Sequence, residues 1–203
     1  MTMTRAYPQT MSTPSGELVL RLLTCEDEQA VLAFAQKLAM HDLLFLRRDI
    51  SNPRVVAAWM AATRDGSIVT IAATRDGAVL GCATIVKDEL GWSRHVCELR
   101  VLIAPELRGQ RVGQRLTQEC FALALEMGLE KMVAQMTVDQ RGAIAVFEGL
   151  GFRAEALLRN HVKDQDGNTH HLVVLSHDVA RFAEQMEAYG LNDAFSPGAG
   201  DAA

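Results

Sequence analysis

The residues best suited to chemistry in this chain lie in residues 101–115, VLIAPELRGQRVGQR. The pattern predicts a β-strand that passes through a Gly-containing turn directly into a helix. The N–H groups of a helix's first turn lack partners within the helix and carry partial positive charge, so they bind anions. Gly109 and Gly113 would let a phosphate approach the backbone without a Cβ in the way. Three arginines add positive charge here: Arg108, Arg111 and Arg115.

The spacing of this segment excludes two common phosphate-binding loops. A Walker A loop requires GxxxxGK followed by Ser or Thr, and the dinucleotide fingerprint requires GxGxxG. Residues 101–115 contain neither pattern. The alternative interpretation is an ordinary strand-to-helix connection with surface arginines.

The same segment resembles the pyrophosphate-binding motif of the GNAT family of N-acetyltransferases, written Arg/Gln-x-x-Gly-x-Gly/Ala. Arg108, Val112 and Gly113 match this motif. Arg111 stands where the family usually has its first glycine. We interpret Arg111 as a tolerated variant, because the loop acts mainly through backbone N–H groups and the added cation could compensate.

A second segment, residues 139–152 (DQRGAIAVFEGLGF), resembles the other signature of this family, in which an Asn, an Ala and a Tyr precede Gly-Phe. The positions that agree are Ala143, Ile144, Glu148, Leu150, Gly151 and Phe152. With both signatures present, the chain is identified as a member of the GNAT family over roughly residues 17–178.

The resemblance implies that acetyl-CoA binds as co-substrate in a gap between the strands expected at residues 95–104 and 131–138. A backbone N–H in this gap would polarise the thioester carbonyl. The residues expected to bind the cofactor are Val101, Leu102, Ile103, Arg108, Gly109, Gln110, Arg111, Val112, Gly113, Gln114, Gln140 and Phe147.

Two positions of the second signature depart from the family. Phe147 occupies the place of the Tyr that in many relatives protonates the departing CoA thiolate, and Phe has no proton to give. Because a thiol has a pKa of about 8.5, water or a nearby His could protonate the thiolate instead. Gln140 replaces the usual Asn and keeps an amide that can bond to the cofactor.

Relatives often use a Glu on the strand before the phosphate loop to accept the proton of the amine, and Glu98 is the candidate catalytic residue here. Strand alternation puts Glu98 on one face with Arg100 and Leu102, and Cys97 on the other. Only a strand bulge would move Glu98 to the opposite face, so a surface carboxylate beside Arg100 is the alternative. Weaker candidates for the base are Asp139, His95 and His161.

Hydrophobic periodicity and turn signals predict the order of the elements. Strands are expected at residues 17–23, 68–74, 78–86, 95–104, 131–138, 152–162 and 169–176. Helices are expected at residues 24–38, 53–63, 113–127, 143–150 and 179–190. The implied fold class is α/β (α+β): a mixed, mostly antiparallel central sheet of about six to seven strands flanked by helices.

The 203 residues predict one folded unit with two tails. Residues 1–16, rich in Thr, Ser and Pro, are expected to be a disordered tail, and residues 17–178 form the acetyltransferase domain. A C-terminal helix at residues 179–190 and a flexible tail at residues 191–203 complete the chain.

Composition limits the partners. A formal net charge of −5 argues against nucleic acid, whose binding depends on Lys and Arg. No apolar run approaches the roughly 18 residues that span a bilayer, so no membrane contact is expected. Four cysteines without a CxxC pair fit a reducing cytoplasm. No metal is expected, since His170 and His171 are adjacent on a strand and point to opposite faces. Many relatives dimerise, and a homodimer is left open.

These features predict an enzyme that transfers the acetyl group of acetyl-CoA directly to a primary amine of a small molecule or protein. A CoA-binding regulatory domain with little turnover and a protein-interaction module are the alternatives. The acceptor is not specified, because its pocket would come from the first helices and residues 41–52, 88–94 and 159–168. A charged group there could recognise a polar acceptor, although such loops are usually solvated: His41, Asp42, Arg47, Arg48 and Asp49.

Overall fold

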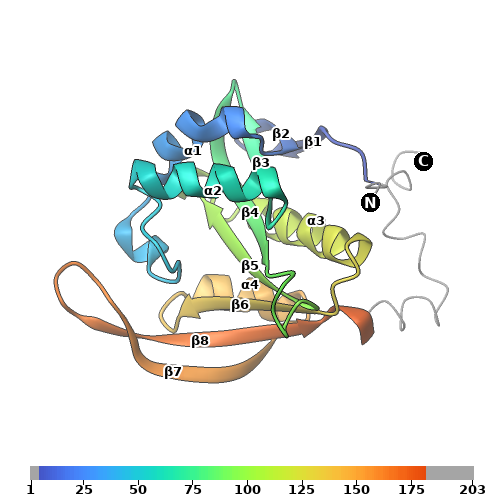
Figure 1. Ribbon diagram of the computed structural model, residues 1–203. Helices are drawn as coiled ribbons and strands as arrows, with labels where there is room; N and C mark the ends of the chain where they lie inside the picture. Colours follow the sequence, from blue (N-terminus) through green and yellow to red (C-terminus); the bar gives the residue numbers. More distant parts are fainter. Residues whose placement is uncertain (1–4, 182–203) are drawn as a thin grey trace.

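The computed structural model describes residues 5–181, which form one mixed sheet with helices on both faces (Figure 1). The strands are β1 (Gln9–Thr13), β2 (Gly16–Leu22), β3 (Ile68–Arg75), β4 (Ala78–Lys87), β5 (Val96–Ile103), β6 (Lys131–Thr137), β7 (Arg153–Lys163) and β8 (Thr169–Asp178). The helices are α1 (Glu28–Ala35), α2 (Pro53–Asp65), α3 (Val112–Glu126) and α4 (Arg141–Gly149). Within this part of the chain the sheet has eight strands in the order β1-β2-β3-β4-β5-β6-β8-β7.

The mostly antiparallel sheet flanked by helices confirms the expected fold class, with one strand more than the upper expected number. The mixed character of the sheet is also confirmed, because β5 and β6 pair in parallel and α3 connects them. A parallel connection between neighbouring strands needs a long crossover, usually a helix, which the sequence supplies.

Local signals in the sequence explain where the elements begin and end. The Oδ1 of Asn52 accepts a hydrogen bond from the N–H of Arg54 at 3.0 Å, and Pro53 occupies the first turn of α2. α2 ends at Gly66, whose φ of 82° is the left-handed conformation that glycine adopts easily. Asp76 and Gly77, a pair that favours tight turns, connect β3 to β4.

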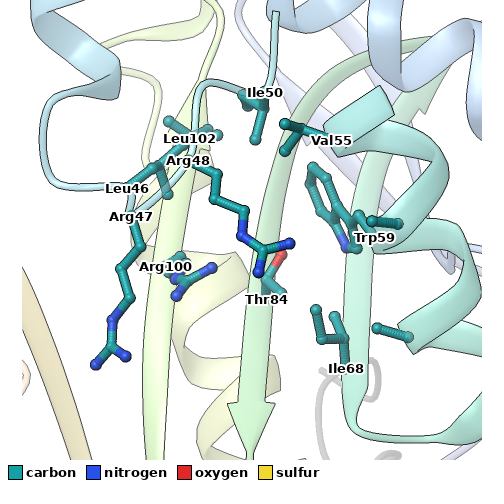
Figure 2. A pocket seen from close by; sticks show the side chains of 12 residues that line it. Leu46, Arg47, Arg48, Ile50, Val55, Trp59, Ile68, Thr84, Arg100 and Leu102 are labelled. Carbon is teal, nitrogen blue, oxygen red and sulfur yellow. The ribbon is translucent and has the colours of Figure 1, made fainter. Parts of the chain in front are cut away.

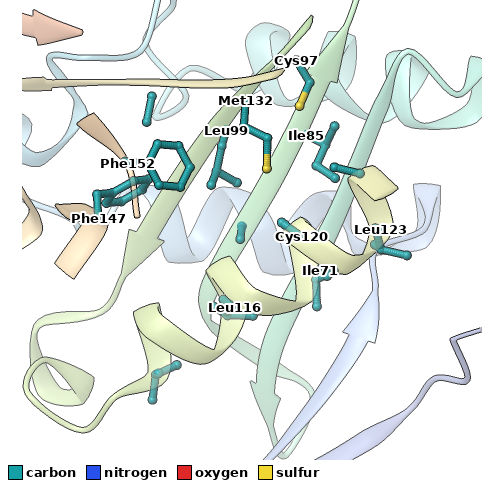
Figure 3. Close-up of a cluster of buried hydrophobic side chains, with 14 of the residues drawn as sticks. Ile71, Ile85, Cys97, Leu99, Leu116, Cys120, Leu123, Met132, Phe147 and Phe152 are labelled. Atoms are coloured by element: carbon teal, nitrogen blue, oxygen red, sulfur yellow. The ribbon is translucent and has the colours of Figure 1, made fainter. Parts of the chain in front are cut away.

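Each face of the sheet buries its own apolar core. On one face α3 packs Leu116, Cys120 and Leu123 against strand residues such as Ile85 and Leu99 (Figure 3). On the other face α1 and α2 bury a second cluster, which contains Val31, Phe34, Val56, Met60 and Leu102. Successive β5 side chains alternate between these two cores, so β5 contributes residues to both faces of the sheet.

β5 and β6 diverge after a short contact. They pair from Val96 opposite Lys131 to Glu98 opposite Val133 and no further. β6 instead pairs with β8 along its whole length, while β5 stays paired with β4 as far as Ile103. The two strands therefore open into a V whose closed end lies at Glu98.

The N-terminal segment differs from the disordered tail that we expected for residues 1–16. Residues Gln9–Thr13 form β1, an edge strand that pairs antiparallel with β2. The expected helix at residues 179–190 begins at Val179 but lies mostly outside the described residues, as does the tail at residues 191–203. No helix among the described residues is long and apolar enough to span a membrane.

Glu119 of α3 holds this N-terminal segment against the sheet. Its carboxylate is fully buried and accepts hydrogen bonds from Arg5 Nε at 2.6 Å and Tyr7 Oη at 2.9 Å, and it pairs with Arg115 at 2.9 Å. Burial alone would raise the pKa of Glu119, but the hydrogen bond and charge of Arg5 lower it below the ordinary value of 4.5. Tyr7, with its pKa raised by burial and by this carboxylate, is a structural residue.

The variant Glu119→Gln should lose about 2 kcal/mol of folding free energy at pH 7, because its neutral amide cannot replace charge-assisted hydrogen bonds. Since the folded pKa is depressed, this stabilisation is present above the ordinary pKa and is lost as pH falls through the lowered one. Urea unfolding from pH 7 to pH 3 should therefore show the two proteins converging. The exposed Glu130→Gln is the control, and a pH-independent difference would contradict this account.

Candidate active site

The opening between β5 and β6 forms a cavity of about 640 Å³, which we call the splay cavity. Its walls come from both strands, the start of α3 and the face of α4. Every predicted cofactor residue except Gln110 lines it: Val101, Leu102, Ile103, Arg108, Gly109, Arg111, Val112, Gly113, Gln114, Gln140 and Phe147. Two segments that are about 30 residues apart in the sequence therefore meet around one space.

Gln110 faces away from the splay cavity. Its Oε1 accepts hydrogen bonds from the N–H of Ser15 at 3.2 Å and from the Ser15 hydroxyl at 2.8 Å. Its Nε2 donates to the carbonyl of Glu106 at 2.7 Å. The Gln110 side chain thus fixes the loop between β5 and α3 to the β1–β2 turn, a contact between distant segments that the local motif does not contain.

Arg111 adopts a backbone conformation that normally belongs to glycine. It is the N-cap of α3 with φ 62° and ψ 8°, in the left-handed region. A side chain there costs roughly 1–2 kcal/mol relative to glycine. The sequence therefore departs from the family motif while the backbone retains the shape that the glycine gives. Among the described residues no side chain caps this helix end, which leaves the first-turn N–H groups to a ligand.

The loop around Arg111 has room for a phosphate. Gly109 has φ 75°, and a Cβ added there would meet no atom within 4 Å. At Gly113 an added Cβ would contact the Ile103 side chain at 3.5 Å, so the backbone packs closely on β5. Backbone without a Cβ at Gly109 and Gly113, the start of α3 and the nearby guanidinium groups are the components of an anion site.

The splay exposes backbone groups of β5 on its β6 side. The N–H of Ala104 donates to the carbonyl of Leu80 at 2.8 Å, so residues alternating from Ala104 direct their backbone groups to β4. The intervening residues, Val101 and Ile103 among them, direct theirs into the splay cavity. Leu102 contributes its side chain to the cavity, whereas its backbone belongs to the β4 ladder.

The second signature supplies an apolar wall and an amide. Phe147 is buried and packs edge-to-face on Phe152 with ring centroids 5.0 Å apart. Gln140 is the N-cap of α4. No hydroxyl replaces the missing Tyr among the described tyrosines, because Tyr7 bonds to Glu119 on the far side of α3. Tyr189 lies outside the described residues.

The segment between α1 and α2, residues 36–52, also lines the splay cavity, whereas from the sequence we expected residues 41–52 in the acceptor pocket only. We call this segment the α1–α2 loop. Leu38, Asp42 and Phe45 from this loop line the cavity. Asp42 Oδ2 accepts a hydrogen bond from Arg108 Nη2 at 2.6 Å, so a loop carboxylate pairs with a predicted phosphate ligand. The charged residues of the loop are evident in the sequence, but no local pattern indicates that Asp42 pairs with Arg108.

The same loop brings a His–Asp pair to the edge of the splay cavity. His41 Nε2 lies 2.6 Å from Asp139 Oδ2, and Asp139 lines the cavity. Burial alone would raise the pKa of Asp139, but hydrogen bonds from Thr137 and the Asp139 backbone lower it, which makes this carboxylate a weak proton acceptor. The other weaker base candidates, His95 and His161, are exposed and line neither this cavity nor the two others found among the described residues.

Glu98 lies on the face predicted by alternation, and the β4–β5 register runs without a bulge at this point. Its carboxylate accepts hydrogen bonds from Arg100 Nε at 2.8 Å and Nη2 at 3.0 Å. Arg47 Nε lies 3.8 Å from Glu98 Oε2. Glu98 therefore does not line the splay cavity; it lies at the closed end of the V, on the face covered by α2.

A second cavity, of about 310 Å³, lies on this face and is lined by Arg47 and Arg100, the ion-pair partners of Glu98 (Figure 2). We call it the α2 cavity. Its lining consists of Leu46, Arg47, Arg48, Ile50, Val55, Ala58, Trp59, Ala62, Ile68, Thr84, Arg100 and Leu102. Leu102 lines the splay cavity as well, so the two spaces meet at β5. The described residues contain no group of three or more side chains suited to a metal ion.

Comparison with known proteins identifies the family. The model described as the acetyltransferase (GNAT) family matches residues 22–152, so the chain belongs to this family. This confirms the resemblance inferred from the two signatures and, with it, the class of enzyme, an acyltransferase. No curated protein matches the sequence.

Solved structures share the fold at low sequence identity. A phosphinothricin acetyltransferase from Sinorhizobium meliloti, in complex with acetyl-CoA, has a TM-score of 0.67 and 19% identity over 79% of this chain and 88% of that chain. A spermidine N-acetyltransferase from Vibrio cholerae, with CoA and spermine, has a TM-score of 0.68 and 15% identity over 82% and 98%. A ribosomal-protein-alanine N-acetyltransferase from Brucella melitensis has a TM-score of 0.66 and 22% identity over 78% and 98%. The names of these three proteins give three kinds of acceptor, so the shared fold does not specify one.

The variant Arg111→Gly should raise the melting temperature by about 2–4 °C, because it removes roughly 1 kcal/mol of left-handed strain. Acetyl-CoA affinity should fall only a few-fold, since the first-turn N–H groups remain. Arg111→Ala is the matched control, because it removes the same cation and keeps the strain. Equal melting temperatures for the Gly and Ala variants would contradict the strain argument; calorimetric titration measures the affinities.

Proposed function

We propose that this protein transfers the acetyl group of acetyl-CoA directly to a primary amine of a small molecule or protein. The observation that carries this proposal is the convergence of both signature segments on the splay cavity, with the start of α3 at its edge. Family membership supports acetyl-CoA as the co-substrate. Neighbours solved with acetyl-CoA or CoA agree with it.

The residues of the splay cavity fit the parts of a CoA thioester. The α3 start and Arg111 would bind the pyrophosphate, with Arg108 once it leaves Asp42. The backbone groups of Val101 and Ile103 would bond to the extended arm, and an N–H in this row would stabilise the oxyanion that forms at the thioester carbonyl.

Glu98 would accept the proton that the amine loses on attack, directly or through a water molecule. This proposal rests on its position at the closed end of the V, beside the α2 cavity. Arg100 donates to both carboxylate oxygens, which fixes the orientation of Glu98, and one of these hydrogen bonds would have to be given up when the proton arrives. With Phe147 in place of Tyr, water would protonate the thiolate, whose conjugate acid has a pKa of about 8.5.

Direct transfer is favoured over a route through an acetylated cysteine. None of the four cysteines lines either cavity. Burial raises the pKa of the Cys82 and Cys97 thiols to about 12, which suppresses the thiolate that such a route needs.

Acetyl-CoA binding tests the cofactor site. By calorimetry the wild type should bind acetyl-CoA with micromolar affinity. The double variant Arg111→Glu, Gly113→Asp should not bind, because it repels the pyrophosphate and blocks the backbone. The matched control is Arg64→Glu, Gly149→Asp, which makes the same charge change at exposed positions outside the cavities. Equal affinity for all three proteins, or none for the wild type, would remove the proposed site.

Turnover separates an enzyme from a CoA-binding domain without activity, the alternative that Phe147 favours. Release of free CoA thiol should depend on an added amine. Glu98→Gln should lower kcat by about 100-fold, the scale of a general base, with acetyl-CoA affinity unchanged. Glu98→Asp should restore part of the rate and shift its pH profile. Full activity in Glu98→Gln would reduce Glu98 to an ion-pair partner of Arg100.

A further inference from the structure

The α2 cavity combines an apolar wall with an excess of positive charge. Three guanidinium groups line it, from Arg47, Arg48 and Arg100, and no carboxylate does. Most of the remaining lining is apolar or aromatic: Leu46, Ile50, Val55, Ala58, Trp59, Ala62, Ile68 and Leu102. A cavity with this lining favours a ligand that is both anionic and apolar.

The neighbouring carboxylates leave part of this charge uncompensated. Glu98, which does not line the cavity, pairs with two of the lining residues, Arg100 and Arg47. Asp49 follows Arg48 in sequence, but its Oδ1 accepts hydrogen bonds from the Ser51 N–H at 2.9 Å and hydroxyl at 2.6 Å. Within the described residues Arg48 has no ion pair, so its guanidinium fork is available to a ligand.

The position of Arg48 directs this charge into the cavity. Figure 2 shows its side chain reaching from the α1–α2 loop toward β4, between Arg100 and the indole of Trp59. Trp59 is itself fixed, because its Nε1 donates a hydrogen bond to Thr70 Oγ1 at 3.2 Å. A planar guanidinium beside a rigid aromatic wall can bind a carboxylate in two parallel hydrogen bonds while the ligand's apolar part packs on the ring.

We propose that the acceptor of this enzyme is an amine that also carries a carboxylate and an apolar group, as in a free apolar α-amino acid. Arg48 binds the carboxylate, Trp59 and its neighbours hold the apolar group, and the amine faces Glu98 and the closed end of the V. This proposal rests on the proposed function, since it takes the α2 cavity as the acceptor site. A polyamine would place its extra cations against the arginines and is disfavoured.

The size of the cavity agrees with a small acceptor. About 310 Å³ is at the lower end of the range for ligand pockets, which suits a single amino acid. The transfer balances without another reactant: the amine nitrogen forms the amide bond, the thioester C–S bond breaks, and the proton lost by nitrogen ends on CoA sulfur or solvent. The product is an N-acetyl amino acid.

A matched ligand series tests the carboxylate. Phenylalanine, phenylalaninamide and phenethylamine share the ring and the amine, and only phenylalanine carries the carboxylate. Calorimetry on the CoA-saturated protein should give phenylalanine an affinity at least about tenfold higher than the other two, as a charge-assisted hydrogen bond predicts. The phosphonate analogue of phenylalanine tests whether another anion is accepted, and spermidine tests the polyamine.

A variant pair assigns the preference to Arg48. Arg48→Gln should abolish the discrimination between phenylalanine and phenethylamine, and Arg48→Glu should reverse it. Arg64→Gln and Arg64→Glu, at an exposed position outside the cavity, should retain the wild-type preference. Acetyl-CoA titration of each variant checks that the splay cavity is intact.

The outcomes separate the two proposals. If acetyl-CoA does not bind, the proposed function fails. If acetyl-CoA binds but phenethylamine or spermidine binds as well as phenylalanine, or no member of the series binds, the carboxylate-bearing acceptor is wrong and the cofactor site stands. A phenylalanine preference that persists in Arg48→Glu would likewise overturn the role of Arg48.

Discussion

The site depends on one feature of strand pairing: β6 keeps its full ladder with β8 but leaves β5 after Glu98. Unpaired backbone groups inside a protein are costly, so a splay persists only where a ligand, side chains or water satisfy them. Here the start of α3 and the face of α4 cover the gap, and they carry the two signature segments. The defect in the sheet and the cavity are the same feature.

The two faces of β5 border different cavities. Side chains on the α3 face, such as Val101 and Ile103, shape the splay cavity, whereas Glu98 and Arg100 on the other face border the α2 cavity. The arginines are divided between the two faces of the sheet in the same way. Arg108 and Arg111 lie at the phosphate loop, and Arg48 lies across the sheet. Arginines thus line both cavities of a chain whose net charge is −5.

Local patterns in the sequence predicted most of the fold, and all but one of the residues expected to bind the cofactor line the splay cavity. Strand alternation placed Glu98 correctly, and the motif spacing located Arg111 at a position whose φ is that of glycine. β1 was missed because QTMST has no apolar alternation, and its position depends on the burial of Glu119 in a helix more than 100 residues away. The roles of His41 and Asp42 were missed for the same reason, since their partners are distant in sequence.

The ion pair between Asp42 and Arg108 links events on the two sides of the sheet. Arg108 donates to Asp42 through Nη2, and Asp42 is on the α1–α2 loop that also carries Arg47 and Arg48. A phosphate that took this nitrogen would free Asp42 and, with it, a contact of the loop that lines the other cavity. By thermodynamic reciprocity, any change that the first ligand makes in the affinity of the second is returned in equal measure.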